Sequence, residues 1–151
     1  MSMADYVSAK AILTANKSRA DFVGPRSEVL IRKAEDFLNI QFPPTYRQFL
    51  LDYGAGNFGP EEFFGVIDED FESSSVPDAV WYTFTERKEV NLPGELFVIG
   101  ETGTGELYCL DLNKSHGPVV IIDPGADISK QKEIANDFGA FLLNRIQNTT
   151  R

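Results

Sequence analysis

The amino-acid sequence predicts a single α+β domain. Segments with apolar residues at helical spacing stand near both ends of the chain, and three short segments of strand-forming residues lie between them. Short, turn-rich connections join these strand segments, which favours antiparallel neighbours. The length of 151 residues suits one domain, and 42% hydrophobic residues with 12 Phe supply enough apolar material for one core.

Two helices are expected near the N-terminus. Tyr6, Ala9 and Leu13 fall at helical spacing, which favours a loose amphipathic helix. A second helix is expected at Ser27–Ile40, where apolar residues recur on one face. Ser27 is placed to cap it, because a serine oxygen can accept a hydrogen bond from an unpaired N–H group of the first turn.

A proline pair separates the second helix from a third. Pro44 suits the first position of a helix, because its missing N–H would have no partner there, and Thr45–Tyr53 carries an apolar stripe. Gly54 then supplies the left-handed turn that ends this helix. A strand is expected at Glu62–Ile67. Val80–Thr85 combines helical spacing with strand-forming residues, so that a helix is favoured and a strand stays open.

The last third of the chain predicts the core sheet and a closing helix. Strands are expected at Leu96–Gly100, Glu106–Leu112 and Pro118–Asp123, with antiparallel pairing between neighbours. Both faces of the middle strand are largely apolar, which predicts a central position in the sheet. The closing helix is expected at Glu133–Gln147, where apolar residues again form one stripe.

The charge of the chain is concentrated in one stretch. The formal net charge is −9, from 23 acidic and 14 basic residues. Between Gln48 and Glu86 there is no Lys or Arg, so this stretch accounts for the whole imbalance. Nine acidic residues occur there: Asp52, Glu61, Glu62, Asp68, Glu69, Asp70, Glu72, Asp78 and Glu86.

An acidic surface restricts the kinds of partner that the protein can have. Its field repels nucleic acid and membrane surfaces and attracts basic proteins. The sequence therefore predicts no nucleic-acid partner and no membrane partner. The alternative is an acidic loop that serves only solubility, and the charge pattern does not distinguish the two.

Patterns that could carry chemistry lack the rest of their motifs. Gly100–Gly105 is glycine-rich but joins two predicted strands, whereas phosphate-binding loops open a helix, so a tight hairpin is favoured. His116 is the only histidine, and a His-based metal cluster or serine triad within one chain is excluded. Asp68–Glu72 lacks the glycine and the final glutamate of a calcium loop. No catalytic residue, metal or cofactor is predicted.

The single cysteine and the first residues suggest a compartment. Cys109 has no partner for an intrachain disulfide, which favours a reducing environment. Met1–Ala20 is interrupted by charged and polar residues and lacks the apolar core of a signal peptide. No segment reaches the roughly 20 apolar residues that span a bilayer. A cytoplasmic location is expected.

Two stretches resemble the SUKH superfamily, the Smi/Knr-type domain. The first is Phe42–Gly56 (FPPTYRQFLLDYGAG), and the second is Leu92–Leu112 (LPGELFVIGETGTGELYCLDL), followed by Gly117–Val120 and Phe138–Leu142. The resemblance covers residues 27–146 in the family's order, which is more specific than any one motif. The turn at residues 54–56 reads Gly-Ala-Gly where many members have an Asn-Gly-Gly type of turn. Residues 1–151 are accordingly expected to form one such domain.

The resemblance implies both a fold and a role. The fold is a curved, mainly antiparallel sheet flanked by N-terminal and C-terminal helices. Many bacterial members are immunity proteins, which bind and neutralise nuclease or deaminase toxins of contact-dependent or polymorphic toxin systems and are not enzymes. The resemblance therefore implies a non-catalytic module that binds a protein, most simply a basic toxin domain. A cellular regulatory protein, like the fungal relatives, and a ligand binder or enzyme with an unrecognised site stay as alternatives.

The acidic stretch and the glycine hairpin supply the candidate contacts. An aromatic residue among acids suits a binding hot spot. For Trp81, however, a position in the core is favoured over a position in the interface, because tryptophans are highly buried on average. The sequence does not indicate the oligomeric state. The candidate partner-binding residues are Glu61, Glu62, Asp68, Glu69, Asp70, Glu72, Trp81, Glu101 and Glu106.

Overall fold

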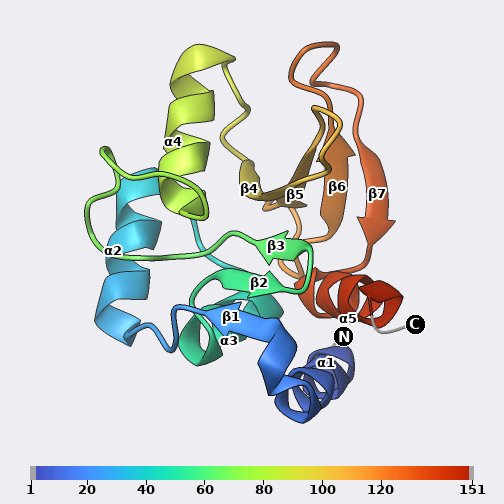
Figure 1. The fold of residues 1–151 in the computed structure, drawn as a ribbon. Helices are drawn as coiled ribbons and strands as arrows, with labels where there is room; N and C mark the ends of the chain where they lie inside the picture. The colour runs from blue at the N-terminus through green and yellow to red at the C-terminus, as the bar shows by residue number, and fades with distance from the viewer. Residues whose placement is uncertain (1–2, 150–151) are drawn as a thin grey trace.

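The computed structural model describes residues 3–149, which form an α+β fold as predicted (Figure 1). Five α-helices and seven strands follow one another, with one short 3-10 helix. In chain order the elements are α1 (Met3–Ala15), η1 (Lys17–Arg19), β1 (Ala20–Phe22), α2 (Glu28–Leu38), α3 (Pro44–Asp52), β2 (Gly56–Phe58), β3 (Glu61–Phe63), α4 (Ala79–Glu89), β4 (Leu96–Glu101), β5 (Leu107–Asp111), β6 (Val119–Ile122), β7 (Lys132–Ala135) and α5 (Phe138–Thr149). Within this part of the chain no helix is long and apolar enough to cross a membrane.

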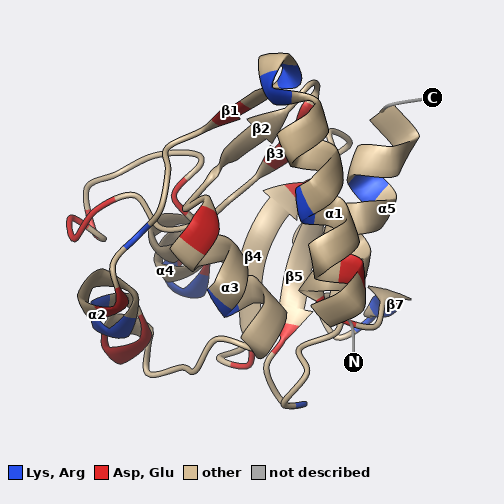
Figure 2. Ribbon diagram, turned by 90° about the horizontal axis from the view of Figure 1, so that it is seen from below, with Lys and Arg blue, Asp and Glu red and all other residues tan. Residues whose placement is uncertain are grey.

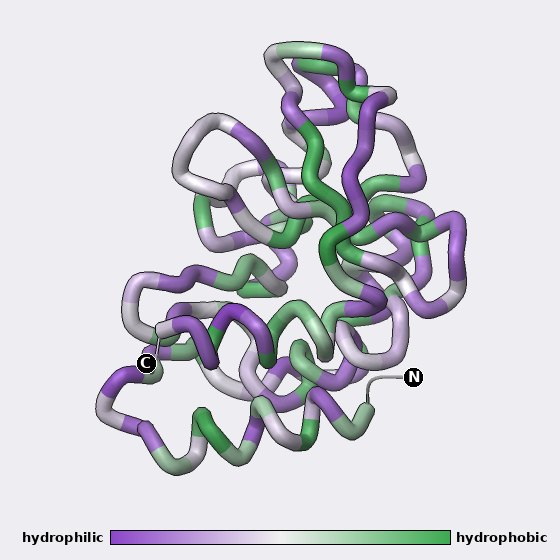
Figure 3. The backbone as a smooth tube through the Cα atoms, turned by 90° about the vertical axis from the view of Figure 1, so that its right-hand side faces the viewer, coloured by the Kyte–Doolittle hydropathy of each residue, from purple (hydrophilic) through white to green (hydrophobic). Residues whose placement is uncertain are grey.

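The strands form two antiparallel sheets, in the orders β1-β2-β3 and β4-β5-β6-β7. The predicted antiparallel pairing of the three core strands is confirmed, and β5 lies between β4 and β6 as its two apolar faces indicated. The sheets meet where the Phe64 N–H donates to the Ile99 carbonyl at 3.0 Å. Figure 1 places α2 and α4 side by side, with α1 and α5 at the opposite end. In Figure 3 apolar β6 lies beside the hydrophilic segment that enters β7.

The helices in the first part of the chain form as the sequence predicted. Ser27 caps α2, since its Oγ accepts a hydrogen bond from the Leu30 N–H at 3.1 Å. Pro44 occupies the first position of α3. Gly54 follows α3 with φ of 76°, the left-handed conformation that a turn after a helix requires.

The closing helix begins later than predicted. The expectation of a helix at Glu133–Gln147 is wrong for its first turn, because Lys132–Ala135 is β7, which pairs with β6. The helix starts at Phe138, where Asp137 accepts a hydrogen bond from the Ala140 N–H at 2.9 Å. Ile134 fell at helical spacing with the later stripe, yet it lies in the strand and is exposed.

The strand predicted at Glu62–Ile67 is shorter than expected. Only Glu61–Phe63 pairs with β2. Gly65 then packs against the backbone of Gly54, and its N–H donates to the Pro77 carbonyl at 2.9 Å. These contacts lead the chain away from the sheet.

Residues 79–89 form a helix, α4, as favoured from their spacing. Asp78 caps it, since Oδ1 accepts from the Trp81 N–H at 3.0 Å. The inward side of α4 covers the free edge of β4, where the buried Thr83 hydroxyl accepts from the Val98 N–H at 2.9 Å. A backbone N–H at a sheet edge is thereby satisfied by a side chain of the helix.

The buried carboxyl of Asp78 should make the stability of the fold depend on pH. Burial is the main cause that raises the Asp78 pKa above its usual 3.8. A raised carboxyl pKa favours the protonated group in the folded state, so its stabilising contribution is complete below about pH 4 and is lost as the pH rises through the folded pKa. Asp78→Asn keeps the capping oxygen and does not titrate. The unfolding free energy of the wild type minus that of Asp78→Asn should fall between about pH 3.5 and pH 7.

Paired urea titrations of the two proteins at each pH measure this difference, because the other carboxyl groups are common to both. A difference that stays constant over the range would contradict the prediction. The total fall over this range should be about 1.4 kcal/mol for each unit by which folding raises the pKa.

Aromatic side chains dominate the core between α3, α5 and the sheets. Phe49 is fully buried and its ring centroid lies 4.9 Å from that of Phe138 and 6.3 Å from that of Phe63. Tyr46 is equally buried, and its hydroxyl donates to the Phe64 carbonyl at 2.9 Å. The one polar atom of the Tyr46 ring is therefore satisfied inside the core.

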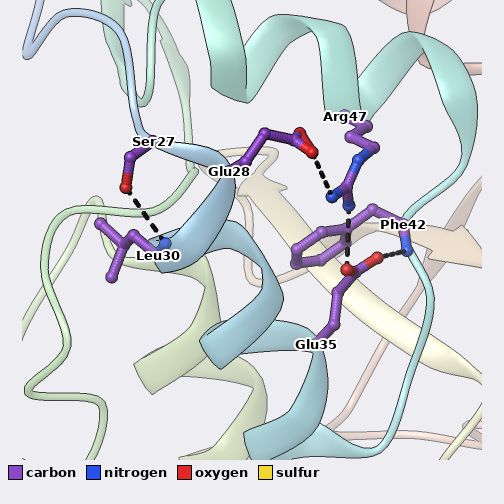
Figure 4. A network of polar contacts seen from close by, with 6 residues as sticks. All are labelled: Ser27, Glu28, Leu30, Glu35, Phe42 and Arg47. Atoms are coloured by element: carbon purple, nitrogen blue, oxygen red, sulfur yellow. Dashed lines mark hydrogen bonds and ion pairs between the residues drawn. The ribbon is translucent and has the colours of Figure 1, made fainter.

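A polar network fastens α2 to α3 (Figure 4). The guanidinium of Arg47 pairs with Glu35 at 2.9 Å and with Glu28 at 3.3 Å. The second oxygen of Glu35 accepts from the Phe42 N–H at 2.8 Å, which fixes the entry into the proline pair. These contacts give a structural role to Phe42 and Arg47, two residues of the stretch that resembles the family.

The N-terminal helix docks on α3 and α5. Tyr6, Ala9 and Leu13 are buried, which confirms the predicted apolar face. The Tyr6 hydroxyl donates to Asp52 Oδ2 at 2.6 Å, and Lys10 pairs with the same oxygen at 3.2 Å. Burial and the Asp52 carboxylate both raise the pKa of Tyr6.

Candidate docking surface

The acidic stretch does not fold into one continuous acidic surface. Three of its nine carboxylates form ion pairs: Asp52 with Lys10, Glu69 with Lys33 at 2.7 Å, and Glu61 with Arg145. A fourth, on Asp78, is buried. Figure 2 shows acidic and basic residues on the same helices α1, α2 and α3. The bases that neutralise the stretch come from segments that are distant in sequence.

The predicted contact residues fall into separate groups. Glu61, Glu62 and Glu101 line one pocket between β3, the turn after β4, and α5. Asp68 and Glu69 line a groove beside the start of α2, and the exposed Asp70 and Glu72 belong to the same loop. Trp81 lies on α4, and Glu106 lines a further groove with β6 and the loop that leads to β7.

The outward side of α4 carries the arrangement that best suits a docking surface. Trp81, Tyr82, Thr85, Glu86 and Glu89 line a shallow cleft of about 200 Å³. The Tyr82 hydroxyl donates to Glu101 Oε2 at 3.0 Å, which joins this cleft to the pocket that contains Glu62. We call the combined surface the acidic α4 face, and its residues are Glu62, Trp81, Tyr82, Thr85, Glu86, Glu89 and Glu101.

Neighbouring carboxylates of the acidic α4 face repel one another. Burial raises the pKa of Glu86, and the neighbouring carboxylates of Glu89 and Glu101 raise it further. Burial and then Glu101 raise the pKa of Glu62 in the same way. In residues 3–149 none of the four forms an ion pair with Lys or Arg. A cationic group docked on this face would relieve the repulsion.

Trp81 corrects the expectation that placed it in the core. Its side chain is only partly buried and lines the cleft on α4. Inward positions of α4 are filled by Val80 and Thr83, which leaves the neighbouring Trp81 on the outward side. The alternative, an aromatic residue at the surface among acids, is the one that the structure supports.

Sequence reasoning overlooked four residues of this region. Glu86 was counted among the acids but not chosen as a contact, and Tyr82, Glu89 and Arg145 were not considered. The spacing of Tyr82, Glu86 and Glu89 (i, i+4, i+7) is the signal that could have found them, since it places all three on one side of a helix.

The features that were set aside as chemical motifs have structural roles. The glycine hairpin connects β4 to β5, with the Thr102 N–H donating to the Glu106 carbonyl at 3.0 Å. His116 lies in the turn before β6. Cys109 is fully buried in β5, and burial raises the pKa of its thiol. Among the described residues no group of three His, Cys, Asp or Glu side chains could hold a metal ion.

One comparison with known proteins bears on this surface. A family model described as SUKH_6, SMI1-KNR4 cell-wall, matches residues 28–142. The match extends from α2 into α5 and includes the whole acidic α4 face, whereas α1 and β1 precede it.

Proposed function

The chain belongs to the SUKH family of SMI1-KNR4 type, and from this membership we propose that it acts by binding another protein, as an immunity protein against a bacterial toxin. The target would be a nuclease- or deaminase-type toxin of a polymorphic or contact-dependent system, met in the cytoplasm. Nuclease toxins carry basic surfaces because they bind phosphate backbones. An acidic protein complements such a surface.

The observation that carries this proposal is the acidic α4 face. Glu86 and Glu89 line the cleft with Trp81 and Tyr82, Glu101 accepts a hydrogen bond from Tyr82, and Glu62 lines the adjoining pocket. None of these four carboxylates has a basic partner in the described chain. An aromatic anchor surrounded by groups that exclude water is typical of an interface hot spot. Burial, and after it the neighbouring carboxylates, raise the pKa values of Glu62 and Glu86, and a cationic group bound beside them would favour their charged forms.

The loop with Asp68, Asp70 and Glu72 supports a different step of binding. Its carboxylates are exposed, and Glu69 is partly neutralised by Lys33. Exposed charges act over about 8 Å at physiological salt and mainly accelerate encounter. We therefore assign steering to this loop and the lasting contacts to the acidic α4 face.

Kinetic measurements with the cognate toxin domain should separate these two contributions. The quadruple variant with Asp68, Glu69, Asp70 and Glu72 changed to Asn and Gln should associate more slowly at low salt, and this difference should shrink as the ionic strength rises. Trp81→Ala should raise the dissociation rate and cost about 2 kcal/mol of binding free energy, roughly 30-fold in Kd. Surface plasmon resonance over a salt series measures both rates.

The matched control is Asp123→Asn with Asp127→Asn, which removes two exposed acids from the loop between β6 and β7. It should alter the rates much less than Glu86→Gln with Glu89→Gln, which removes the same charge from the acidic α4 face. Circular dichroism and melting verify the fold of each variant. Equal effects of the two double variants would show that only net charge matters and would reject this docking surface.

The alternative is a cellular regulatory protein, which the cell-wall description of the matching family favours. A neighbouring gene for a large secreted toxin supports the immunity role and supplies the toxin domain for the binding assay. If that domain is not bound, the immunity role is rejected.

A further inference from the structure

The pocket beside the acidic α4 face has a composition that suits one kind of side chain. It has a volume of about 280 Å³ and lies between β3, the turn after β4, and α5. Glu62 and Glu101 belong to its lining, together with the aromatic residues Tyr108 and Phe141. The two rings contact each other, with centroids 4.9 Å apart, so the aromatic wall is fixed by packing.

A guanidinium of the chain itself already lies at this pocket. Arg145 projects from α5 and pairs through Nε with Glu61, and its Cζ lies 5.7 Å from the centroid of the Tyr108 ring. Carboxylate pairing combined with stacking on an aromatic face is the recognition mode that distinguishes Arg from Lys. Arg145 uses only part of the pocket's acceptor capacity, because Glu62 and Glu101 form no ion pair in the described chain.

We propose that this pocket receives an arginine side chain of the bound partner, between Glu62 and Glu101 and against Tyr108. That the arginine comes from a bound protein rests on the proposed function. That the side chain is an arginine rests on the residues that line the pocket. A second guanidinium would neutralise these two carboxylates, which have no basic partner in the described chain, and would be held in a planar, hydrogen-bonded arrangement. Arg145 then acts as an internal competitor, because it holds the third carboxylate, Glu61.

The test needs no toxin. The peptide acetyl-Gly-Arg-Gly-amide is titrated into ¹⁵N-labelled protein at low salt and followed by two-dimensional NMR, with the citrulline peptide as the uncharged control. The amides of Glu62, Gly103 and Tyr108 should shift and saturate with the arginine peptide only. Glu62→Gln with Glu101→Gln should weaken this binding at least fivefold, and folded spectra of the variant confirm that the loss is local.

A second pair of variants tests the role of Arg145. Arg145→Gln frees Glu61 and should tighten peptide binding severalfold. Lys33→Gln makes the same change of charge and frees Glu69 in a different groove, so it should leave the affinity nearly unchanged. Equal tightening by both variants would overturn the competitor role, because a general charge effect would then explain the result.

The outcomes separate this inference from the proposed function. Shifts that do not saturate, that are as large on residues 68–72, or that persist in the Glu62/Glu101 variant would overturn the arginine pocket. If the toxin domain binds the Glu62/Glu101 variant as tightly as the wild type, the pocket is rejected while the immunity role stands. If the peptide binds and the toxin domain does not, the pocket is supported and the immunity role is rejected.

Discussion

Replacing Phe49 by alanine is expected to lower the free energy of unfolding by about 3–5 kcal/mol. The side chain is fully buried, and its ring packs against the rings of Phe22, Tyr53 and Phe138. Truncation removes this apolar burial and leaves a cavity among rigid rings that cannot collapse to fill it. Urea denaturation followed by circular dichroism measures the change.

Val29→Ala is the control for this experiment, since Val29 on α2 is 65% exposed. It should change the unfolding free energy by no more than about 0.5 kcal/mol. A loss of less than about 1 kcal/mol for Phe49→Ala would show that α3 does not contribute its apolar stripe to the core.

Gly65→Ala should be comparably severe, with a loss of about 3 kcal/mol or more. A methyl group on Gly65 would overlap the carbonyl oxygen of Gly54, which is itself the acceptor for the Val66 N–H at 3.1 Å. The clash therefore involves backbone atoms and cannot be relieved by turning a side chain. It would also disturb the bond from the Ala79 N–H to the Gly65 carbonyl, 2.8 Å long, at the start of α4.

Gly94→Ala provides a matched comparison, because a methyl group there would meet nothing within 4 Å. It should be nearly neutral, or slightly stabilising through a less flexible unfolded chain. Thermal melting of the two variants side by side tests the prediction. A Gly65→Ala protein that melts within about 2 °C of the wild type would show that the backbone of residues 54 and 65 separates at little cost.

Much of the fold could be predicted because the signals were local. The stripe around Phe49, the cap at Ser27 and the proline start at Pro44 each depend on residues within two helical turns. The later start of α5 was missed, although Asp137 is a cap residue in the sequence. The spacing of Ile134 with Phe138 concealed it, since four-residue spacing occurs by chance where a strand precedes a helix.

The role of Gly65 could not be predicted in the same way. Position 65 requires glycine because any side chain there would meet the backbone of Gly54. Gly54 belongs to a different turn and approaches Gly65 only in the folded chain. Long-range contacts also explain why the acidic stretch predicted one acidic surface, whereas the structure separates its residues into several groups. Asp52 and Glu61 meet bases from the two ends of the chain, and such long-range pairing leaves no pattern in the sequence.

One side of α4 packs against the sheet and the other side faces outward, and this separation affects which substitutions the protein can accept. The inward side, through Thr83, satisfies the edge of β4, and Asp78 caps the helix by accepting a hydrogen bond from the Trp81 backbone N–H. The side chains of Trp81, Glu86 and Glu89 on the outward side take no part in either contact. Substitutions on the outward side can therefore accumulate without loss of folding. Under the proposed immunity role, a lineage that faces changing toxins would exchange its specificity there while it inherits an unaltered scaffold.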